Sequence, residues 1–434
     1  MPTSSLPQRL EPTLKHRAGK RLCVGFSGGL DSFVLLHLLA LLAPVCGFQL
    51  SAVHVHHGLS PNAEAWAAHC VRVADKLGVA LAVHRVTVER AGEGLEAAAR
   101  AARHAVFAEQ ACDWIVLAHH RGDQVETVLH RLMRGTGVHG VGAMRARDDA
   151  RRILRPLLDV SRAELEAYAR EQGLAWIEDE SNADTALTRN FLRREVLPVW
   201  SAKQPALEAN LARAAGLFAE AAGLLDVLAA DDALRVSPGA EDSLQRLREM
   251  AEGGDGARAR NLLRHLLTRE GGLPPEADHL GEALRQLCEA EEGVRVALGD
   301  WALCAWRSRF WIEPAALGAP DALVWRGEPE LRWGAGSLHF AEANGPEALR
   351  IAPDGSVRVT VRAGGERLRP RANGPSRAFK QLAQEADVPP WQRDSLPCLW
   401  LGDDLLWIGT LGADAAHCCA PGEVGWRVTW SPSS

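Results

Sequence analysis

The chain has 434 residues, which is too long for one ordinary hydrophobic core, so we expect two or three domains. A hydrophobic content of 47% with 24% charged residues is typical of a globular protein and excludes a disordered chain. The formal net charge is −6, but arginines are clustered at residues 145–155, 189–194 and 358–380. These clusters either bind a phosphate backbone or form ordinary solvated surface.

The composition disfavours a membrane protein and a cysteine-based scaffold. The longest apolar run, residues 34–45, is too short to span a membrane, and the N-terminus lacks the layout of a signal peptide. Nine cysteines are scattered without a C-x-x-C pair, which argues against a disulfide framework, a zinc ribbon or an iron–sulfur site. We therefore expect a cytoplasmic protein whose thiols are reduced.

The first 200 residues alternate short apolar runs with amphipathic stretches. We expect strands at residues 22–26, 50–55, 80–88 and 114–118, and helices at residues 33–42, 62–77, 95–110 and 124–134. This alternation predicts βαβ units and an α/β fold with a doubly wound parallel sheet, in which ligands bind at the carboxyl ends of the strands.

A glycine-rich turn follows the first expected strand, with the sequence Ser27-Gly28-Gly29-Leu30-Asp31-Ser32. Its glycines allow positive φ angles, and its amides and hydroxyls can form an anion site at the start of the next helix. The lysine and spacing of a Walker loop are absent, and Asp31 instead suits a Mg²⁺ ion beside a pyrophosphate. The turn resembles the PP-loop of ATP pyrophosphatases, and a chance polar turn is the alternative.

Two further segments carry candidate nucleotide contacts. His54, His56 and His57 end the second expected strand, where imidazoles stack on a base or donate to a ribose. Arg100 shares one face of the next helix with Glu96 and Arg103. That face is either a solvated ion-pair stripe or a means for Arg100 to reach phosphate oxygens with its planar guanidinium.

Paired acids follow the fourth expected strand, after His119 and His120. Asp123 and Glu126 are three residues apart at a helix start, so their carboxylates project from nearly the same face. Asp123 can serve as a helix cap. Alternatively, the two acids receive a cationic substrate and help to deprotonate an amine.

The character of the chain changes twice after residue 202. Residues 206–231 and 257–269 have helical periodicity. Alternating segments at 331–340, 356–361 and 405–409, with ten of the 14 tryptophans from Trp301 on, indicate a β-rich C-terminal module. We place a domain with the PP-loop-like turn at 1–202, a helical middle domain at 203–315, and a small β-rich domain, which contains the arginine cluster 358–380, at 316–434.

Taken in order, these blocks resemble one family, the tRNA(Ile)-lysidine synthetases, bacterial enzymes that modify the wobble cytidine of a minor isoleucine tRNA. The resemblance is carried by residues 27–32, 54–59, 94–103, 119–127, 131–137, 155–158, 176–182, 189–193, 364–370, 379–380 and 388–394. It implies a cytoplasmic ligase with ATP as co-substrate and Mg²⁺ as cofactor. It implies tRNA(Ile) with a CAU anticodon and free L-lysine as partners, no membrane, and a homodimer as one open alternative.

The resemblance also implies roles for single residues. ATP activates the C2 oxygen of the cytidine as an adenylate, and the ε-amine of lysine then displaces AMP. Phosphates would lie on residues 27–32, with His54 and His119 also at the nucleotide and Asp31 on Mg²⁺. Arg100 would stabilise the transferring phosphoryl group, and Asp123 and Glu126 would recognise lysine.

Further expectations concern the RNA. The glycine-rich stretch 135–151 is expected to be a mobile loop that closes over a flipped-out cytidine. Arg189, Arg193 and residues 362–380 would hold tRNA phosphates, while Trp391 is expected in a core.

Gly122 departs from the family pattern, because many members carry an acid there. The pair His56-His57 also departs, because it replaces a more polar pair of some relatives.

Three other functions compete with this one. A tRNA thiolase needs a persulfide cysteine or a cluster, and the cysteine spacing offers no C-x-x-C pair for either. An amide-forming synthetase fed by glutamine would need a glutaminase site, and none is visible. A non-catalytic tRNA-binding module is disfavoured by the intact turn and by the paired acids.

Overall fold

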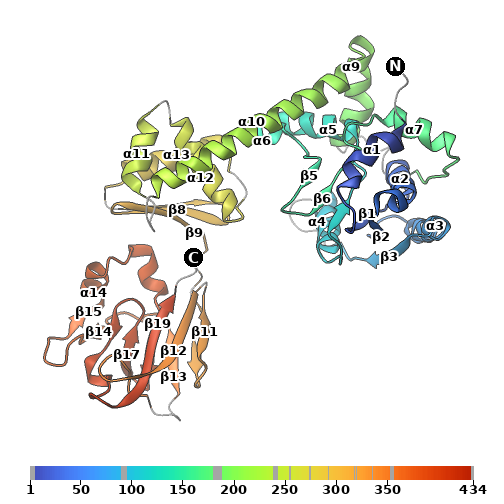
Figure 1. Cartoon of the computed structure of the whole chain (residues 1–434). Coiled ribbons are helices and arrows are strands. Elements are labelled where there is room, and N and C mark those ends of the chain that lie inside the picture. Colours follow the sequence, from blue (N-terminus) through green and yellow to red (C-terminus); the bar gives the residue numbers. More distant parts are fainter. Residues whose placement is uncertain are drawn as a thin grey trace. The chain divides into compact units, whose positions relative to one another are not determined.

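The computed structural model describes residues 5–88, 95–178, 188–237, 243–253, 256–272, 275–291, 293–316, 318, 320–334, 336–351 and 356–431. Gly94, the side chain of Glu96 and residues 179–182, all named above, lie outside this part. The chain forms two compact units, Met1–Leu224 and Leu225–Ser434, which we describe separately (Figure 1). Within the described residues, no helix has the length and apolar character needed to cross a membrane.

A six-stranded sheet forms the centre of the first unit. Its strands lie in the order β3 (Ala80–Arg85), β2 (Gln49–His56), β1 (Arg21–Gly25), β4 (Trp114–Val116), β6 (Ile153–Leu154) and β5 (Arg147–Asp148). All neighbours are parallel except β5 and β6. The four expected strands are confirmed. The strand order reverses between β1 and β4, and ligands bind at such a switch point in open α/β sheets.

Helices cover both faces of this sheet. Leu22 and Val24 of β1 pack with α1 (Leu6–Lys15), α2 (Leu30–Cys46), α3 (Ala63–Lys76) and α7 (Arg162–Glu171). Cys23 points to the opposite face, where it packs with Val106 and Phe107 of α4 (Leu95–Ala108). Alternate side chains of a strand point to opposite faces, so this division confirms the doubly wound α/β fold.

Helix α2 is longer than expected and apolar on every side. It begins at Leu30, directly after the glycine-rich turn, and ends before Gly47, whose φ of +73° makes it a left-handed C-cap. Leu35, Leu36, Leu38 and Leu39 are fully buried, and each such side chain stabilises the fold by about 1.5–3 kcal/mol. A helix that is apolar all round belongs in a core, so α2 anchors the turn rigidly.

A second group of helices lies beside the sheet. It comprises α5 (Arg121–Leu132), α6 (Val138–Val141), α8 (Thr188–Phe191), a π-helix (Leu192–Val196) and α9 (Leu197–Lys203). Val125 and Leu129 of α5 pack against Leu192 and Leu197. The stretch 135–151 is not only a loop, because it contains α6 and β5. Arg131 holds it through hydrogen bonds from Nη1 to the carbonyl oxygens of Gly140 (2.8 Å) and Ala143 (3.2 Å).

Four helices and a small sheet form the first part of the second unit. The long helix α10 (Leu207–Val236) enters from the first unit and is followed by α11 (Leu244–Glu252), α12 (Ala257–Arg269) and α13 (Ala277–Glu289). The sheet of β7 (Val294–Leu298), β8 (Trp301–Trp306) and β9 (Arg309–Pro314) packs on these helices through Leu303, Ala305 and Phe310. The helices expected at 206–231 and 257–269 are confirmed, whereas α11 and α13 were not foreseen.

The C-terminal part is rich in strands, as expected. One sheet joins β10 (Leu323–Trp325), β13 (Val357–Thr360), β16 (Cys398–Leu401), β17 (Asp404–Ile408) and β18 (Gly412–Ala413). Another joins β11 (Glu330–Trp333), β12 (Gly336–Asn344) and β19 (Val424–Ser431), and a third joins β14 (Arg367–Leu368) and β15 (Arg377–Ala378). Short helices occur at α14 (Phe379–Glu385), Pro390–Ser395 and Ala415–His417.

Two expectations about this part can be compared with the structure. The segment 331–340 is a hairpin of β11 and β12, not one strand. Trp391 lies against Trp311 and Trp306 with ring centroids 6.1 Å apart in each pair, in agreement with packing. The domain boundaries at residues 202 and 315 stay a prediction.

Candidate functional site

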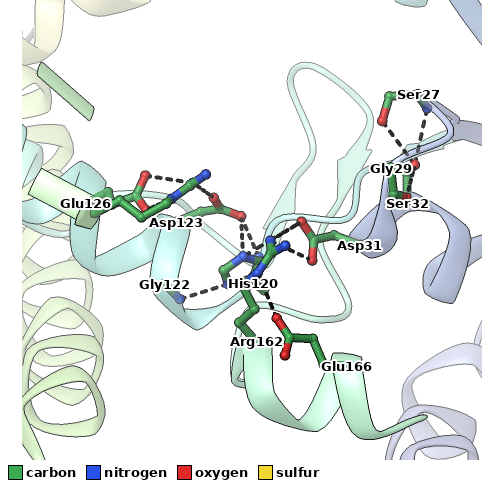
Figure 2. A network of polar contacts seen from close by, with 11 residues as sticks. Ser27, Gly29, Asp31, Ser32, His120, Gly122, Asp123, Glu126, Arg162 and Glu166 are labelled. Carbon is green, nitrogen blue, oxygen red and sulfur yellow. Dashed lines mark hydrogen bonds and ion pairs between the residues drawn. The ribbon is translucent and has the colours of Figure 1, made fainter. Parts of the chain in front are cut away.

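The glycine-rich turn closes on itself at the end of β1. The Ser32 hydroxyl donates to the Gly29 carbonyl oxygen (3.0 Å), accepts from the Ser27 amide (3.2 Å) and lies 3.0 Å from the Ser27 hydroxyl (Figure 2). Gly28 has a φ of +86°, and a Cβ there would lie 2.9 Å from the Cys70 sulfur. Leu30 is buried in the core, so it offers only its backbone to a ligand. The turn is therefore a rigid backbone cradle.

A segment that sequence reasoning did not connect to this turn packs on it. The Ile177 amide donates to the Gly28 carbonyl oxygen at 3.1 Å. A Cβ on Gly28 would lie 3.5 Å from Cδ1 of Ile177. Residues 149 positions apart thus meet at the glycine-rich turn, and no local pattern could have revealed this contact.

Asp31 projects from the first turn of α2 beside two other side chains. Its Oδ2 lies 3.2 Å from Nη1 of Arg162, the first residue of α7, and 3.9 Å from Nε2 of His120 (Figure 2). Arg162 also pairs with Glu166 at 3.3 Å. Burial raises the pKa of Asp31, while the charges of Arg162 and Arg193 oppose that change. Arg162 shows that this carboxylate faces a position where a cation is stabilised.

Among the described residues, no group of three or more histidine, cysteine or acidic side chains is placed to hold a metal ion. The Asp31 carboxylate by itself fits Mg²⁺, because Mg²⁺ usually takes one or two protein carboxylates together with substrate phosphates and water. Asp31 stands one residue after the cradle, so one ion can reach both the carboxylate and a phosphate held there.

His120 joins the switch point to the paired acids. It is the N-cap of α5, and its Nδ1 accepts a hydrogen bond from the Gly122 amide at 2.9 Å. Its own amide donates to Oδ2 of Asp123 at 2.9 Å. Nε2 lies 3.6 Å from the same Asp123 oxygen. The interpretation of Asp123 as the N-cap is therefore wrong: His120 is the N-cap, and Asp123 stands three residues later, where its carboxylate accepts from the His120 amide and completes the capping box. Asp123 also faces the site.

Asp123 and Glu126 converge on one cation, the Arg193 guanidinium. Nε of Arg193 lies 2.6 Å from Oε1 of Glu126, and Nη2 lies 3.0 Å from Oε2 of Glu126 and 3.3 Å from Oδ1 of Asp123. Glu126 is only 3% exposed, and burial raises its pKa although Arg193 opposes the rise. The expectation that Arg193 binds tRNA phosphates did not include its contact with Glu126, which lies 67 residues earlier in the chain.

His54 and His119, the two expected nucleotide contacts, lie at the ends of β2 and β4. His54 is buried and places Nδ1 2.9 Å from the Phe26 carbonyl oxygen, so it fastens the turn after β1 to β2. Burial, together with the smaller effects of the Arg155 and Arg100 charges, lowers the pKa of His119 to about 4 against the opposing effect of Asp123. His119 is therefore a neutral imidazole at physiological pH.

Arg100 belongs to a local concentration of positive charge. Arg100, Arg103, Arg151 and Arg155 all lower the pKa of His104 after burial, which has the largest effect. The Arg155 guanidinium donates to the Arg145 carbonyl oxygen at 2.8 Å and lies within the same field. Arg100 thus lies on a positively charged side of the site, near His119, whereas Asp123 and Glu126 form its negatively charged side.

Comparisons with known proteins cover almost the whole chain. A PP-loop domain model matches residues 2–200, a TilS substrate binding domain model matches 243–311, and a TilS substrate C-terminal domain model matches 357–430. The tRNA(Ile)-lysidine synthase of Azoarcus sp. (strain BH72) is 47% identical over 430 residues, which cover 95% of this chain and 92% of the relative.

A second relative agrees with the first, and a solved structure is more distant. The tRNA(Ile)-lysidine synthase of Aromatoleum aromaticum is 46% identical over 420 residues, covering 95% of this chain and 97% of the relative. The U34-tRNA thiolase NcsA from Methanococcus maripaludis aligns with 50% of this chain and 78% of its own, at a TM-score of 0.44 and 15% identity. That structural likeness decides nothing about the reaction. The two full-length relatives do decide the family: the chain belongs to the tRNA(Ile)-lysidine synthases.

Proposed function

We propose that the first unit carries out both steps of lysidine formation at the switch point of its sheet. In the first step, ATP adenylates the C2 oxygen of the wobble cytidine of tRNA(Ile) with a CAU anticodon. In the second step, the ε-amine of free lysine forms the C–N bond, and AMP leaves. One observation carries the proposal: Asp31, in the glycine-rich turn, and Asp123, at the start of α5, lie on either side of one buried histidine, His120.

The nucleotide end is built from backbone and one acid. Amides of residues 28–30, at the N-terminus of α2, would hold phosphate oxygens, since the amides and the dipole at a helix N-terminus favour anions. Asp31 would hold Mg²⁺, which neutralises charge on the pyrophosphate when it is bound. Ser32 keeps the cradle in shape through its bonds to Ser27 and Gly29.

Arg100 is proposed to stabilise the charge that develops on the transferring phosphoryl group. Its supporting evidence is its place in the positive field around His119, next to Arg155. A planar guanidinium binds oxyanions with two parallel hydrogen bonds, and such groups contribute most where water is excluded. The neutral His119 can donate one hydrogen bond there without adding charge.

The lysine end is proposed to be Asp123 with Glu126. Arg193 shows that both carboxylates face one position in which a cation fits. Of its three contacts, the 3.3 Å contact between Nη2 and Asp123 is the longest. We therefore expect the lysine ammonium to take that place, while the Glu126–Arg193 pair stays bound. Asp123 would then contact the amine and accept its proton before attack.

The C-terminal part is proposed to bind tRNA through a few exposed cations. Several arginines of residues 362–380 are occupied within the protein: Arg362 pairs with Asp394 at 2.8 Å, and Arg377 pairs with Glu385. Arg369, Arg371 and Lys380 are exposed, and within the described residues their side chains form no ion pair. These three are the better candidates for phosphate contacts.

Thiolase chemistry has no support at this site. Cys70 touches the cradle at Gly28, but burial raises its pKa to about 12. A thiol must be a thiolate to act as a nucleophile or metal ligand, so Cys70 is a packing residue.

The test is an incubation of the full chain with ATP, Mg²⁺, labelled lysine and a tRNA(Ile) transcript bearing a CAU anticodon. We expect ATP-dependent label at the wobble cytidine and none on methionine tRNA. ATP–pyrophosphate exchange that requires the tRNA separates the first step from the second. Intact tRNA binding without exchange or label would instead indicate a binding protein and would refute the proposal.

A further inference from the structure

His120 occupies a position that the roles proposed above leave unexplained. Its side chain is 3% exposed, and within the described part of the chain its Nε2 has no hydrogen-bond partner. The ring lies between an acid from α2, Asp31, and an acid from α5, Asp123 (Figure 2). A buried polar atom without a partner costs about 1–3 kcal/mol, so its persistence here calls for a function.

The hydrogen bonds of the ring determine which nitrogen carries the proton. The Gly122 amide can only donate, so Nδ1 must present its lone pair to that amide. In a neutral imidazole the hydrogen then sits on Nε2, the atom that faces both acids. Nε2 lies 3.6 Å from Asp123 and 3.9 Å from Asp31, which is too long for a hydrogen bond but close enough to tighten when the site fills.

The two acids need such a partner because they repel each other. Asp123 adds to the larger effect of burial in raising the pKa of the Asp31 carboxyl, whereas Arg162 and Arg193 lower it. Arg162 pairs with Asp31, and Arg193 pairs with Asp123 and acts on Asp31 only through its charge. His120 lies within 4 Å of both acids, at 3.9 Å from Asp31 and 3.6 Å from Asp123.

Gly122, the residue that departs from the family pattern, makes room for this ring. A Cβ at position 122 would lie 2.7 Å from Cε1 and 3.1 Å from Nδ1 of His120, which is closer than real contacts allow. An alanine there would push the ring away from its place between the acids. The glycine and the histidine therefore act as one unit in this chain.

We propose that His120 is a positioning residue whose Nε2–H group links Asp31 at the nucleotide end to Asp123 at the lysine end. The adenylation step and the lysine step then depend on the same imidazole, although they use different acids. This inference rests on the proposed roles of Asp31 and Asp123. It assigns His120 a hydrogen-bonding role, not that of a base.

Two substitutions separate this role from helix capping. In His120→Asn, the amide oxygen replaces Nδ1 as the acceptor for Gly122, and asparagine is a good N-cap, but nothing reaches the position of Nε2. In His120→Gln, the longer side chain brings an N–H group to that position at the expense of the cap. A hydrogen bond to a charged group contributes a factor of about ten or more.

We expect His120→Asn to keep the unfolding temperature of the wild-type chain. We expect it to slow tRNA-dependent ATP–pyrophosphate exchange and to raise the KM for lysine, each by about tenfold or more. His120→Gln should recover most of both losses, and Gly122→Ala should reproduce part of them without altering the histidine. His84→Asn, a matched change on β3 outside the site, should affect neither step.

The opposite order, with His120→Asn active and His120→Gln impaired, would assign His120 to capping alone and overturn the inference. Loss of only one step in His120→Asn would overturn it as well. If the wild-type chain exchanges pyrophosphate but attaches no lysine, the proposed function fails separately. In that case, the role of His120 is still decided by which of His120→Asn and His120→Gln has the higher rate of ATP–pyrophosphate exchange and which has the higher unfolding temperature.

Discussion

Replacing Arg193 with methionine should destabilise the first unit through the acid that it leaves behind. Arg193 makes two hydrogen bonds to Glu126, at 2.6 and 3.0 Å, and Glu126 is only 3% exposed. Methionine keeps much of the aliphatic length of arginine but removes the charge. The buried carboxylate then has lost its cation, with Asp123 still nearby as a like charge.

The size of the effect follows from the burial of the two partners. Removing one partner of a buried ion pair costs about 3–5 kcal/mol. The Arg193 side chain is 36% exposed, so water screens part of the pair, and we expect about 2–3 kcal/mol. For a unit of about 200 residues, that corresponds to a decrease in Tm of roughly 5–10 °C.

The loss of stability in Arg193→Met should depend on pH, and the pKa of Glu126 determines the direction of this dependence. Burial already holds the pKa of Glu126 above its usual value, and removal of Arg193 removes a group that lowers it. A glutamate in the unfolded chain has a pKa of about 4.3, so below that pH the carboxyl is neutral in both states and the penalty vanishes. The penalty grows as the pH rises toward the folded-state pKa. The deficit of Arg193→Met should therefore be smaller at pH 5.5 than at pH 8.

Scanning calorimetry at both pH values tests this reasoning, with the transition of the first unit identified by its shift on addition of ATP. Arg194→Met is the matched control, because Arg194 is exposed and should tolerate the change within about 0.5 kcal/mol. Adding Glu126→Gln to Arg193→Met should restore at least half of the lost stability. Equal deficits for the two arginine variants, or a deficit independent of pH, would refute the assignment to the Glu126 carboxylate.

Three further changes test the rest of the site. Asp31→Asn should lower tRNA-dependent ATP–pyrophosphate exchange by about 10²–10³-fold, and an unchanged exchange rate would remove Asp31 from the nucleotide end. Glu126→Gln and Asp123→Asn should leave exchange nearly intact and raise the KM for lysine, more strongly in Asp123→Asn; an equal loss of both steps would contradict the division of labour. Arg369→Ala and Arg371→Ala should each weaken tRNA binding and reduce the slope of log binding constant against log salt concentration by about one, measured by filter binding between about 50 and 200 mM salt. Arg377→Ala should change this slope less, because the charge of Arg377 is already paired with Glu385.

The architecture of the first unit was predictable because its signals are local. Apolar runs of strand length alternate with amphipathic stretches, and Gly28 with its neighbours marks the turn that follows β1. The edge strand β5 and its neighbour β6 were not predicted, because each is only two residues long. In the second unit, α13 has buried Leu280, Ala283, Leu284 and Leu287 at helical spacing, so a closer count of periodicity would have found it.

The candidate site was predictable as a set of acids and a phosphate loop, but its pairings were not. Asp123 and Glu126 stand out because they are three residues apart on one helix. Their partner Arg193 comes from a π-helix 67 residues later than Glu126, and Arg162 comes from α7, 131 residues after Asp31. Such contacts depend on the packing of whole helices, for example Leu129 against Leu192, and leave no trace in local spacing.

The same pairings explain why one fold can hold two opposite charges close together. A phosphate cradle needs a positive surrounding, whereas an ammonium site needs a negative one, and the two must lie within reach of one cytidine. In this chain, charges of both signs act on His119: Asp123 raises its pKa, and Arg155, Arg100 and Arg103 lower it, beneath the larger effect of burial. Asp123 and Glu126 share the cation of Arg193. Between the two acids stands the imidazole of His120, whose Nδ1 accepts from the Gly122 amide and whose Nε2 faces both carboxylates. A lysine or arginine at position 120 would neutralise Asp123 and weaken the attraction for an ammonium group, which gives a physical reason for histidine at this position.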